Sequence, residues 1–114
     1  MKASLAAAAA TLLLAFPAQG SRGVLSLRAQ LAPFMDQCLV ALVDRENDTW
    51  DPQRSNKKSG AYGLPQALPG SKMRSAGADW ATNPVTQLRW LATYVRRWGG
   101  SCGALVHSRS YGWY

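Results

Sequence analysis

Glu46 is a candidate general acid, although a glutamate at a helix end is usually a solvated or ion-paired residue. It is the only glutamate among the six acidic residues of a 114-residue sequence. It ends a run that reads as an amphipathic helix from Pro33, with the proline in the first turn. Both burial and a helix C-terminus disfavour a charged carboxylate, so they raise the pKa of a carboxyl group placed there. Such a group can stay protonated near neutral pH and act as a general acid.

The predicted helix places Glu46 on its apolar side. At about 100° per residue, one stripe of the helix collects Phe34, Met35, Cys38, Leu39, Leu42 and Glu46. Asp36, Gln37 and Asp44 fall on the opposite side. We therefore expect the Glu46 side chain to point toward the buried side. Arg45 projects about 100° away and need not neutralise it.

A long irregular segment follows Glu46. Residues 47–79 are rich in Asn, Asp, Ser, Gly, Pro and Lys, with turn signals such as Leu68-Pro69-Gly70. We expect a short helix within this segment, around residues 71–76. Loops of this length are uncommon in a compact domain and often carry function. The basic side chains of the segment can equally form an ordinary solvated surface: Lys57, Lys58, Lys72 and Arg74.

Two further helices are expected after the loop. Asn83 can cap a helix that opens with Pro84 and stops at Gly99-Gly100. One face of this helix should pack on the first helix and is formed by Val85, Leu88, Ala92 and Val95. Ser101 can cap a final short helix over residues 102–107. The chain is thus predicted to be a mainly α domain with three to four helices and a long loop.

The first twenty residues have the features of a secretory signal peptide. Lys2 precedes an Ala/Leu run over residues 3–16, and Ala18-Gln19-Gly20 supplies small residues for cleavage after Gly20. The run is shorter than the roughly twenty apolar residues that span a bilayer, which disfavours a retained anchor. We expect a lead-in over residues 21–33 and a domain over residues 34–114. The product should be secreted or periplasmic and cell-wall associated, with no stable membrane anchor.

Cysteine usage and charge agree with export. Cys38 and Cys102 are better explained as a disulfide than as two free thiols, because exported chains meet an oxidising environment. Two Cys and one His cannot build a four-ligand zinc site, so neither a metal nor another cofactor is expected. Loss of Lys2 with the signal lowers the net charge from +7 to +6. That basicity favours an anionic partner such as a cell wall, a membrane surface or nucleic acid. Export and the lack of a recognised motif disfavour nucleic acid.

Several short motifs, taken in order, resemble the lytic-transglycosylase-like branch of the lysozyme superfamily. They are Glu46-Asn47-Asp48-Thr49-Trp50-Asp51-Pro52, Ser59-Gly60-Ala61-Tyr62-Gly63-Leu64-Pro65-Gln66 and Pro69-Gly70-Ser71-Lys72-Met73. The likeness continues through Gly77-Ala78-Asp79-Trp80, Asn83-Pro84, Gln87, Trp90 and Tyr94 to Gly112-Trp113-Tyr114. Small secreted actinobacterial and aggregation-promoting-factor-like members end in the same way. The resemblance covers roughly residues 34–114 and implies a small lysozyme-like fold with a long active-site loop.

The resemblance implies an enzyme that cleaves the MurNAc–GlcNAc bond of peptidoglycan. It implies that Glu46 is the catalytic acid and base, that Gln66 contacts substrate, and that Gly63 lets the loop pass close to the sugar. Aromatic faces pack against sugar rings, so the candidate sugar contacts are Trp50, Tyr62, Trp80, Trp113 and Tyr114. Each of these can instead be ordinary core packing in a domain this small.

Three functions are compatible with these residues. A lytic transglycosylase needs one glutamate, which protonates the bond and then deprotonates the muramic acid 6-hydroxyl to give a 1,6-anhydro sugar. A muramidase-type hydrolase ordinarily uses a second carboxylate, as a nucleophile or as a general base. No spacing demands that Glu46 pair with any of the candidates Asp44, Asp48, Asp51 and Asp79.

Departures from the resembled pattern leave a non-catalytic wall-binding protein as the third function. Asn47 stands where the family usually has Ser, and Pro65 where it commonly has Met or Gly. The broader family's Ala-Tyr-Asn motif is missing, so the tyrosine that would steady Glu46 is not identified. In all three cases we expect a monomer that binds peptidoglycan glycan strands and not nucleic acid.

Overall fold

The computed structural model describes residues 25–114 of a chain that divides into two units, residues 1–31 and 32–114. The described part of the first unit contains α3 (Leu27–Leu31). The Ser26 hydroxyl begins this turn by accepting a hydrogen bond from the Ala29 amide at 3.1 Å. The expected lead-in therefore includes a short helix. The predicted signal peptide, residues 1–20, lies outside the described residues.

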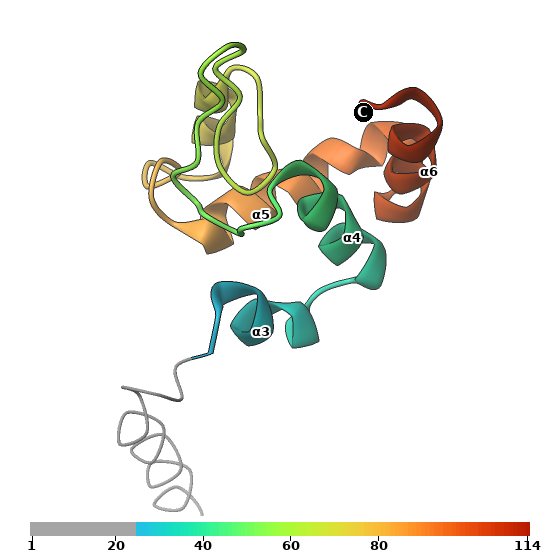
Figure 1. Cartoon of the computed structure of the whole chain (residues 1–114), viewed down its shortest axis with the longest axis horizontal. Coiled ribbons are helices and arrows are strands. Elements are labelled where there is room, and N and C mark those ends of the chain that lie inside the picture. Colours follow the sequence, from blue (N-terminus) through green and yellow to red (C-terminus); the bar gives the residue numbers. More distant parts are fainter. Residues whose placement is uncertain (1–24) are drawn as a thin grey trace, which may run out of the picture. The chain divides into compact units, whose positions relative to one another are not determined.

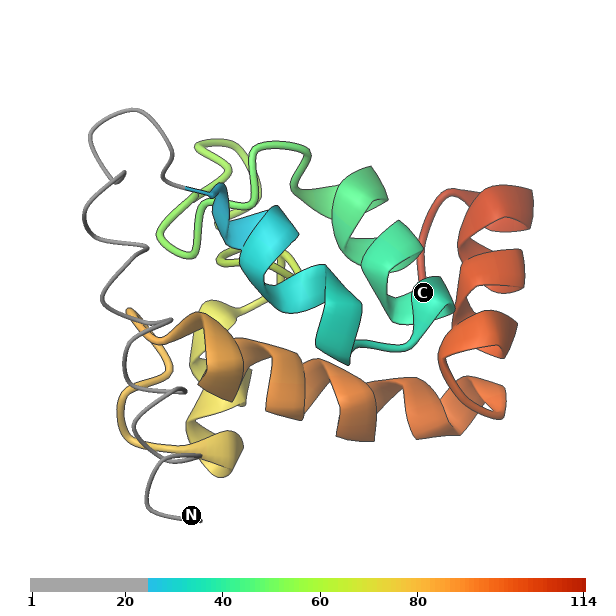
Figure 2. The same ribbon diagram turned by 90° about the horizontal axis from the view of Figure 1, so that it is seen from below.

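The second unit is mainly helical. Its elements are η1 (Ala32–Phe34), α4 (Gln37–Glu46), η2 (Gly70–Ala76), α5 (Pro84–Tyr94), η3 (Val95–Trp98) and α6 (Ser101–Tyr111), as Figure 1 shows. Helix α4 packs beside α6, whereas α5 contacts η2 and η3 (Figure 2). We expected one face of α5 to pack on α4, but the main contacts of α5 are with η2 and η3. Within residues 25–114, no helix has both the length and the apolar character needed to cross a membrane.

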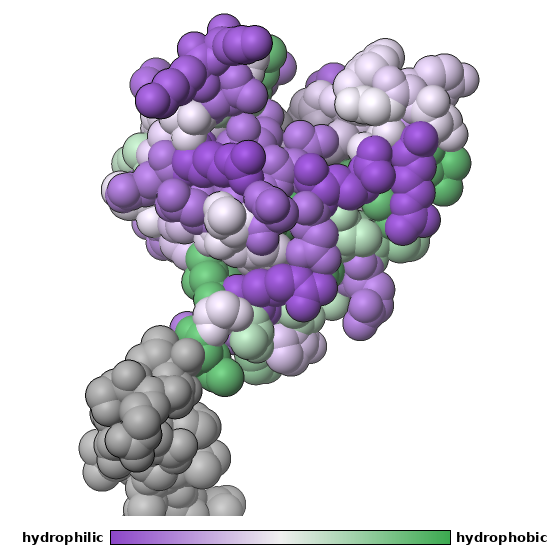
Figure 3. All heavy atoms as spheres, in the orientation of Figure 1, coloured by the Kyte–Doolittle hydropathy of each residue, from purple (hydrophilic) through white to green (hydrophobic). Residues whose placement is uncertain are grey.

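A long loop separates α4 from η2. Residues 47–69 form no strand and only isolated bridges, which join Tyr62 to Ser55 and to Ala67. Figure 3 shows strongly hydrophilic side chains gathered over this loop, whereas the segment after α6 forms a paler surface. The expected irregular connection is confirmed, and the short helix within it is the 3-10 helix η2.

Helix α4 begins later than the sequence predicts. Asp36 caps it, because Oδ1 of its carboxylate accepts hydrogen bonds from the amides of Cys38 and Leu39 at 2.7 and 3.2 Å. The predicted start at Pro33 was wrong, since Pro33 lies in η1 and Phe34 is 88% exposed. The face that α4 buries carries Leu39, Val40, Leu42 and Val43.

Helix α5 follows its predicted start and stop, but its buried face is rotated. Asn83 accepts a hydrogen bond from the Val85 amide at 2.9 Å, and the helix continues through η3 to Gly99 in the left-handed region. Val85 and Ala92 are exposed, contrary to prediction. Four residues lie inside instead, two of them polar: Thr86, Gln87, Leu88 and Leu91. The rotation turns Gln87 toward the loop, whereas the Thr86 hydroxyl donates to Asp79.

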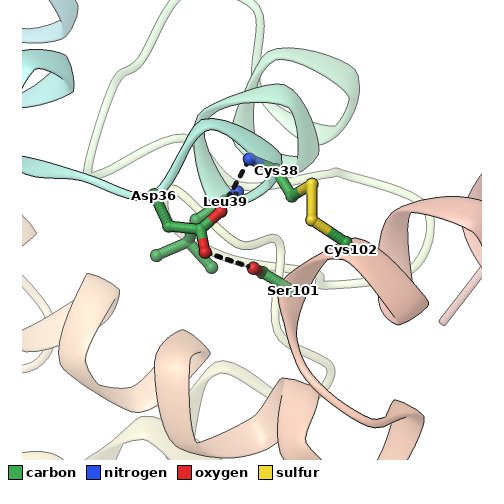
Figure 4. The surroundings of a disulfide bond; sticks show 5 residues. All are labelled: Asp36, Cys38, Leu39, Ser101 and Cys102. Atoms are coloured by element: carbon green, nitrogen blue, oxygen red, sulfur yellow. Dashed lines mark hydrogen bonds between the residues drawn. A yellow bond between two sulfur atoms is a disulfide. The ribbon is translucent and has the colours of Figure 1, made fainter.

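The predicted disulfide is confirmed and joins α4 to α6. Cys38 bonds to Cys102 near the start of both helices (Figure 4). Helix α6 starts at Ser101 and runs to Tyr111, four residues beyond the predicted end. Ser101 does not cap it, because the cap position is Gly100 and Ser101 is the first residue of the helix. The Ser101 hydroxyl donates instead to Oδ2 of Asp36 at 2.8 Å. Asp36 thus caps α4 with one oxygen and holds α6 with the other.

We predict that the double substitution Cys38→Ser/Cys102→Ser lowers the free energy of unfolding by about 4 kcal/mol. The physical reason is the chain entropy of the unfolded state, because the bond spans a sequence separation of 64. Urea unfolding followed by circular dichroism measures the loss. Reduction of the wild type should give the same loss, and an unchanged midpoint in both cases would contradict the prediction.

Candidate active site

The loop after Glu46 is held first by the buried amide of Asn47. This side chain is fully buried. Its Nδ2 donates to the carbonyl oxygens of Asp51 and Gly63 at 2.8 and 2.9 Å. Its Oδ1 accepts from the Thr49 hydroxyl at 3.0 Å and from the Asp51 amide at 3.2 Å. Asn47 therefore fastens two parts of the loop to the end of α4, which explains a buried asparagine at this position.

A second buried amide, Gln87 of α5, holds the loop from the other side. Its Oε1 accepts from the Leu64 amide at 2.9 Å, and its Nε2 donates to the carbonyl oxygens of Pro52 and Trp80, both at 2.8 Å. Gly63 lies against it with φ +79°, and a Cβ there would come within 2.8 Å of Oε1. Gly63 is buried and does not line the cleft described below. It makes room for Gln87 rather than for a ligand.

A cleft of about 260 Å³ lies at the C-terminal end of α4. Five segments line it: the end of α4, the loop at residues 65–68, η2, α5, and the segment after α6. The structure brings four of the predicted site residues to it, namely Glu46, Gln66, Trp113 and Tyr114. Lys72, Trp90 and Tyr94 also line it and were not predicted as site residues. The spacing of Trp90 and Tyr94, four residues apart on one helix, is the signal that could have placed them together.

The electrostatic setting of Glu46 favours its protonated form. Burial raises the pKa of this half-buried carboxyl, and the nearby Arg45 opposes the rise more weakly. The Arg45 guanidinium is turned to α6, where it donates to the hydroxyl and carbonyl oxygens of Ser108 at 3.0 and 3.2 Å. Within the described residues, no hydrogen bond or salt bridge reaches the Glu46 carboxylate. Glu46 can therefore hold a proton at a higher pH than an ordinary glutamate.

Glu46 is the only acidic side chain lining the cleft among residues 25–114. The other acids accept hydrogen bonds elsewhere, from helix or loop amides or from other side chains. They are Asp36, Asp44, Asp48, Asp51 and Asp79. Among the described residues, the cleft thus offers one acidic side chain for proton transfer and no second one to act with it.

Gln66 is fixed in an unusual conformation beside Glu46 in the cleft wall. Its backbone φ is 53°, a left-handed value that residues other than glycine rarely adopt. Its Nε2 donates to the carbonyl oxygens of Arg54 and Gly63 at 3.2 and 2.9 Å. Both amide hydrogens are therefore used, which leaves the amide oxygen to accept from a ligand. Strained residues of this kind cluster at functional sites.

The segment after α6 closes the cleft. Tyr94 donates from its hydroxyl to the main-chain oxygen of Tyr114 at 3.1 Å. The Tyr114 hydroxyl faces the carbonyl oxygen of Pro65 at 3.4 Å. Burial raises the pKa of Tyr114, and the neighbouring charge of Glu46 raises it further, so this phenol stays neutral. His107 Nδ1 lies 2.8 Å from the Trp113 carbonyl oxygen, and the Trp113 side chain is 58% exposed. The structure therefore places two tyrosines and an accessible tryptophan in the cleft with Glu46.

Three aromatic residues predicted to contact sugar do not line the cleft. Trp50 is 3% exposed, and its Nε1 donates to Asp44 at 2.8 Å. Tyr62 donates from its hydroxyl to the Ala81 carbonyl at 2.6 Å and meets the edge of Trp80 at 5.7 Å. These side chains stabilise the loop, because a small domain needs its bulky groups for packing.

No protein-family model, no curated protein and no solved structure matches the chain. The lysozyme-like relationship therefore stays a prediction.

We predict that Gly63→Ala lowers the free energy of unfolding by about 3 kcal/mol, because it adds a clash with Gln87 to the left-handed strain. Gly60→Ala is the matched control, since Gly60 has φ +83° and no atom lies within 4 Å of the position that its Cβ would take. It should cost about 1 kcal/mol, from backbone strain alone. Urea unfolding measures both, and equal losses would contradict the role of Gln87.

We predict that Glu46→Gln stabilises the fold at neutral pH. A raised folded-state pKa means that the wild type is most stable when Glu46 is protonated and loses stability as pH rises through that pKa. Glutamine has no charge to desolvate, so the variant should be more stable than the wild type at pH 7. The two proteins should coincide below about pH 4. Thermal unfolding across this range measures the difference, and a variant less stable at pH 7 would contradict the desolvation of Glu46.

Proposed function

We propose that this chain is a secreted peptidoglycan lytic transglycosylase that uses Glu46 as its only catalytic acid and base. The observation that carries the proposal is the cleft, where one partly desolvated carboxyl group without a bonded partner meets aromatic side chains. The disulfide supports export, because such bonds persist in oxidising compartments.

In the proposed reaction, Glu46 first donates a proton to the substrate and then takes one back from it. Protonated Glu46 donates to the glycosidic oxygen, and the bond between that oxygen and the muramic acid anomeric carbon breaks. The resulting carboxylate then takes the proton of the muramic acid 6-hydroxyl, whose oxygen bonds to the anomeric carbon. Glu46 is protonated again, and no water is consumed. A glutamate with a raised pKa suits both steps, because it releases and recovers the proton near the working pH.

The other groups of the cleft suit binding of a glycan. Trp90, Tyr94 and Trp113 supply aromatic surface for sugar C–H groups. The oxygen of Gln66 can accept a hydrogen bond from a sugar hydroxyl. Lys72 can pair with an acidic substituent of the substrate.

We favour transglycosylation over hydrolysis because the cleft has no second acidic side chain among the described residues. A two-carboxylate glycosidase places its groups about 5–9.5 Å apart across the bond. The aspartates of the described residues lie outside the cleft. A muramidase that activates water without a second carboxylate is the alternative enzyme, and a wall-binding protein without turnover is the non-enzymatic one.

Digestion of purified peptidoglycan tests the proposal. The wild type should release muropeptides ending in 1,6-anhydro sugars, identified by mass spectrometry. Glu46→Gln should lower the rate at least about 100-fold, because it removes the transferable proton. Asp48→Asn is the matched control, since it removes an exposed carboxylate that pairs with Arg54 outside the cleft. It should release products at the wild-type rate.

Each alternative has its own result. Reducing ends in place of anhydro sugars would show hydrolysis and contradict the transglycosylase. Retention on insoluble peptidoglycan by both wild type and Glu46→Gln, without release by either, would identify a binding protein. Equal release of muropeptides by the wild type and Glu46→Gln would show that Glu46 is not the catalytic residue.

A further inference from the structure

A second cavity, of about 670 Å³, lies along α5 and shares a wall with the Glu46 cleft. Trp90 and Tyr94 line both cavities. Their rings are stacked with centroids 4.7 Å apart and planes 22° apart. The two cavities therefore meet at this aromatic pair, and we call the second cavity the arginine groove.

The charged groups of the arginine groove are cationic. Arg89, Thr93 and Arg97 recur every fourth residue and so lie in one row, which places two guanidinium groups and a hydroxyl along the groove. No acid lines it among the described residues. Asp79 exerts some attraction on Arg89, but the Asp79 carboxylate already accepts from Thr86 and Asn83.

The position of Arg97 is set by the shared wall. Its guanidinium carbon lies 4.3 Å from the centre of the Tyr94 ring, a cation–π arrangement that orders a long side chain. A guanidinium offers paired N–H donors that match the two oxygens of a carboxylate. The groove is also too large for one small ion and has room for a short peptide segment.

We propose that the arginine groove binds the carboxylate groups of an acidic peptide branch carried by the glycan strand in the Glu46 cleft. This inference rests on the proposed function and extends it, because it assigns a second site to the same substrate. The shared aromatic wall is what ties the two sites together, since it puts the anion site next to the sugar site. Arg89 and Arg97 would then select strands that still bear their peptides over strands stripped of them.

Binding to two defined glycans tests the proposal. The probes are a soluble peptidoglycan oligomer with its peptides and the same oligomer after enzymatic removal of the peptides. Titration calorimetry is done with the full chain carrying Glu46→Gln, so that neither probe is consumed. The peptide-bearing oligomer should bind about tenfold more tightly, and this advantage should shrink as salt is added.

The variant Arg89→Gln/Arg97→Gln should lose this advantage and bind the bare oligomer as before. Arg96→Gln/Arg109→Gln is the matched control, because it removes the same two charges from exposed positions outside the groove. It should keep the advantage. Circular dichroism checks that both double variants are folded.

Distinct results overturn the inference and the proposed function. If the bare oligomer binds and the peptides add nothing, or if both double variants lose the advantage equally, the arginine groove is not a carboxylate site. If poly(glycerol phosphate) displaces the peptide-bearing oligomer and binds tightly only when Arg89 and Arg97 are present, the groove recognises phosphate and the assignment is wrong. If neither oligomer binds at all, the proposed function itself has failed.

Discussion

The structure depends on satisfying the backbone of a loop whose own main-chain hydrogen bonds form turns and isolated bridges, with no helix and no strand. Buried carbonyl and amide groups without partners are costly, and residues 47–69 have neither a helix nor a strand to supply them. Asn47 and Gln87 supply partners from opposite sides, one from the end of α4 and one from α5. In both side chains, the amide nitrogen donates two hydrogen bonds and the amide oxygen accepts at least one. Removing either one would leave several loop groups unsatisfied at once.

The cleft follows from this arrangement. Asn47 comes directly after Glu46, so the residue that holds the loop also fixes the position of Glu46 at the end of α4. Gln87 fixes Leu64, and the neighbouring residues then form the cleft wall at Pro65 and Gln66. The opposite wall comes from the segment after α6, whose helix is tied to α4 by Asp36 and the disulfide. Groups that do not line the cleft therefore determine its shape.

The distribution of charge leaves Glu46 as the only acidic side chain of the cleft among the described residues. The aspartates are used for helix capping, loop turns and side-chain contacts, so they do not compete with Glu46 for the cleft. Arg45, the closest cation in sequence, is turned to Ser108. A carboxyl group left without a partner in this way keeps the raised pKa that proton transfer requires.

Local signals in the sequence were sufficient for much of this protein. The mainly helical class, the cap at Asn83, the stop at Gly99, the disulfide and the place of Glu46 at a helix end all depend on neighbouring residues or on cysteine chemistry. Long-range competition decided the rest. Asp36 caps α4 and so sets where the helix begins. Gln87 of α5 faces the loop and bonds to it. Trp50 and Tyr62 pack inside the domain and support the loop. The sequence by itself placed Glu46 at a helix end, whereas only the tertiary structure decided which aromatic residues line the cleft with it, because hydrogen bonds between distant segments set which faces are buried.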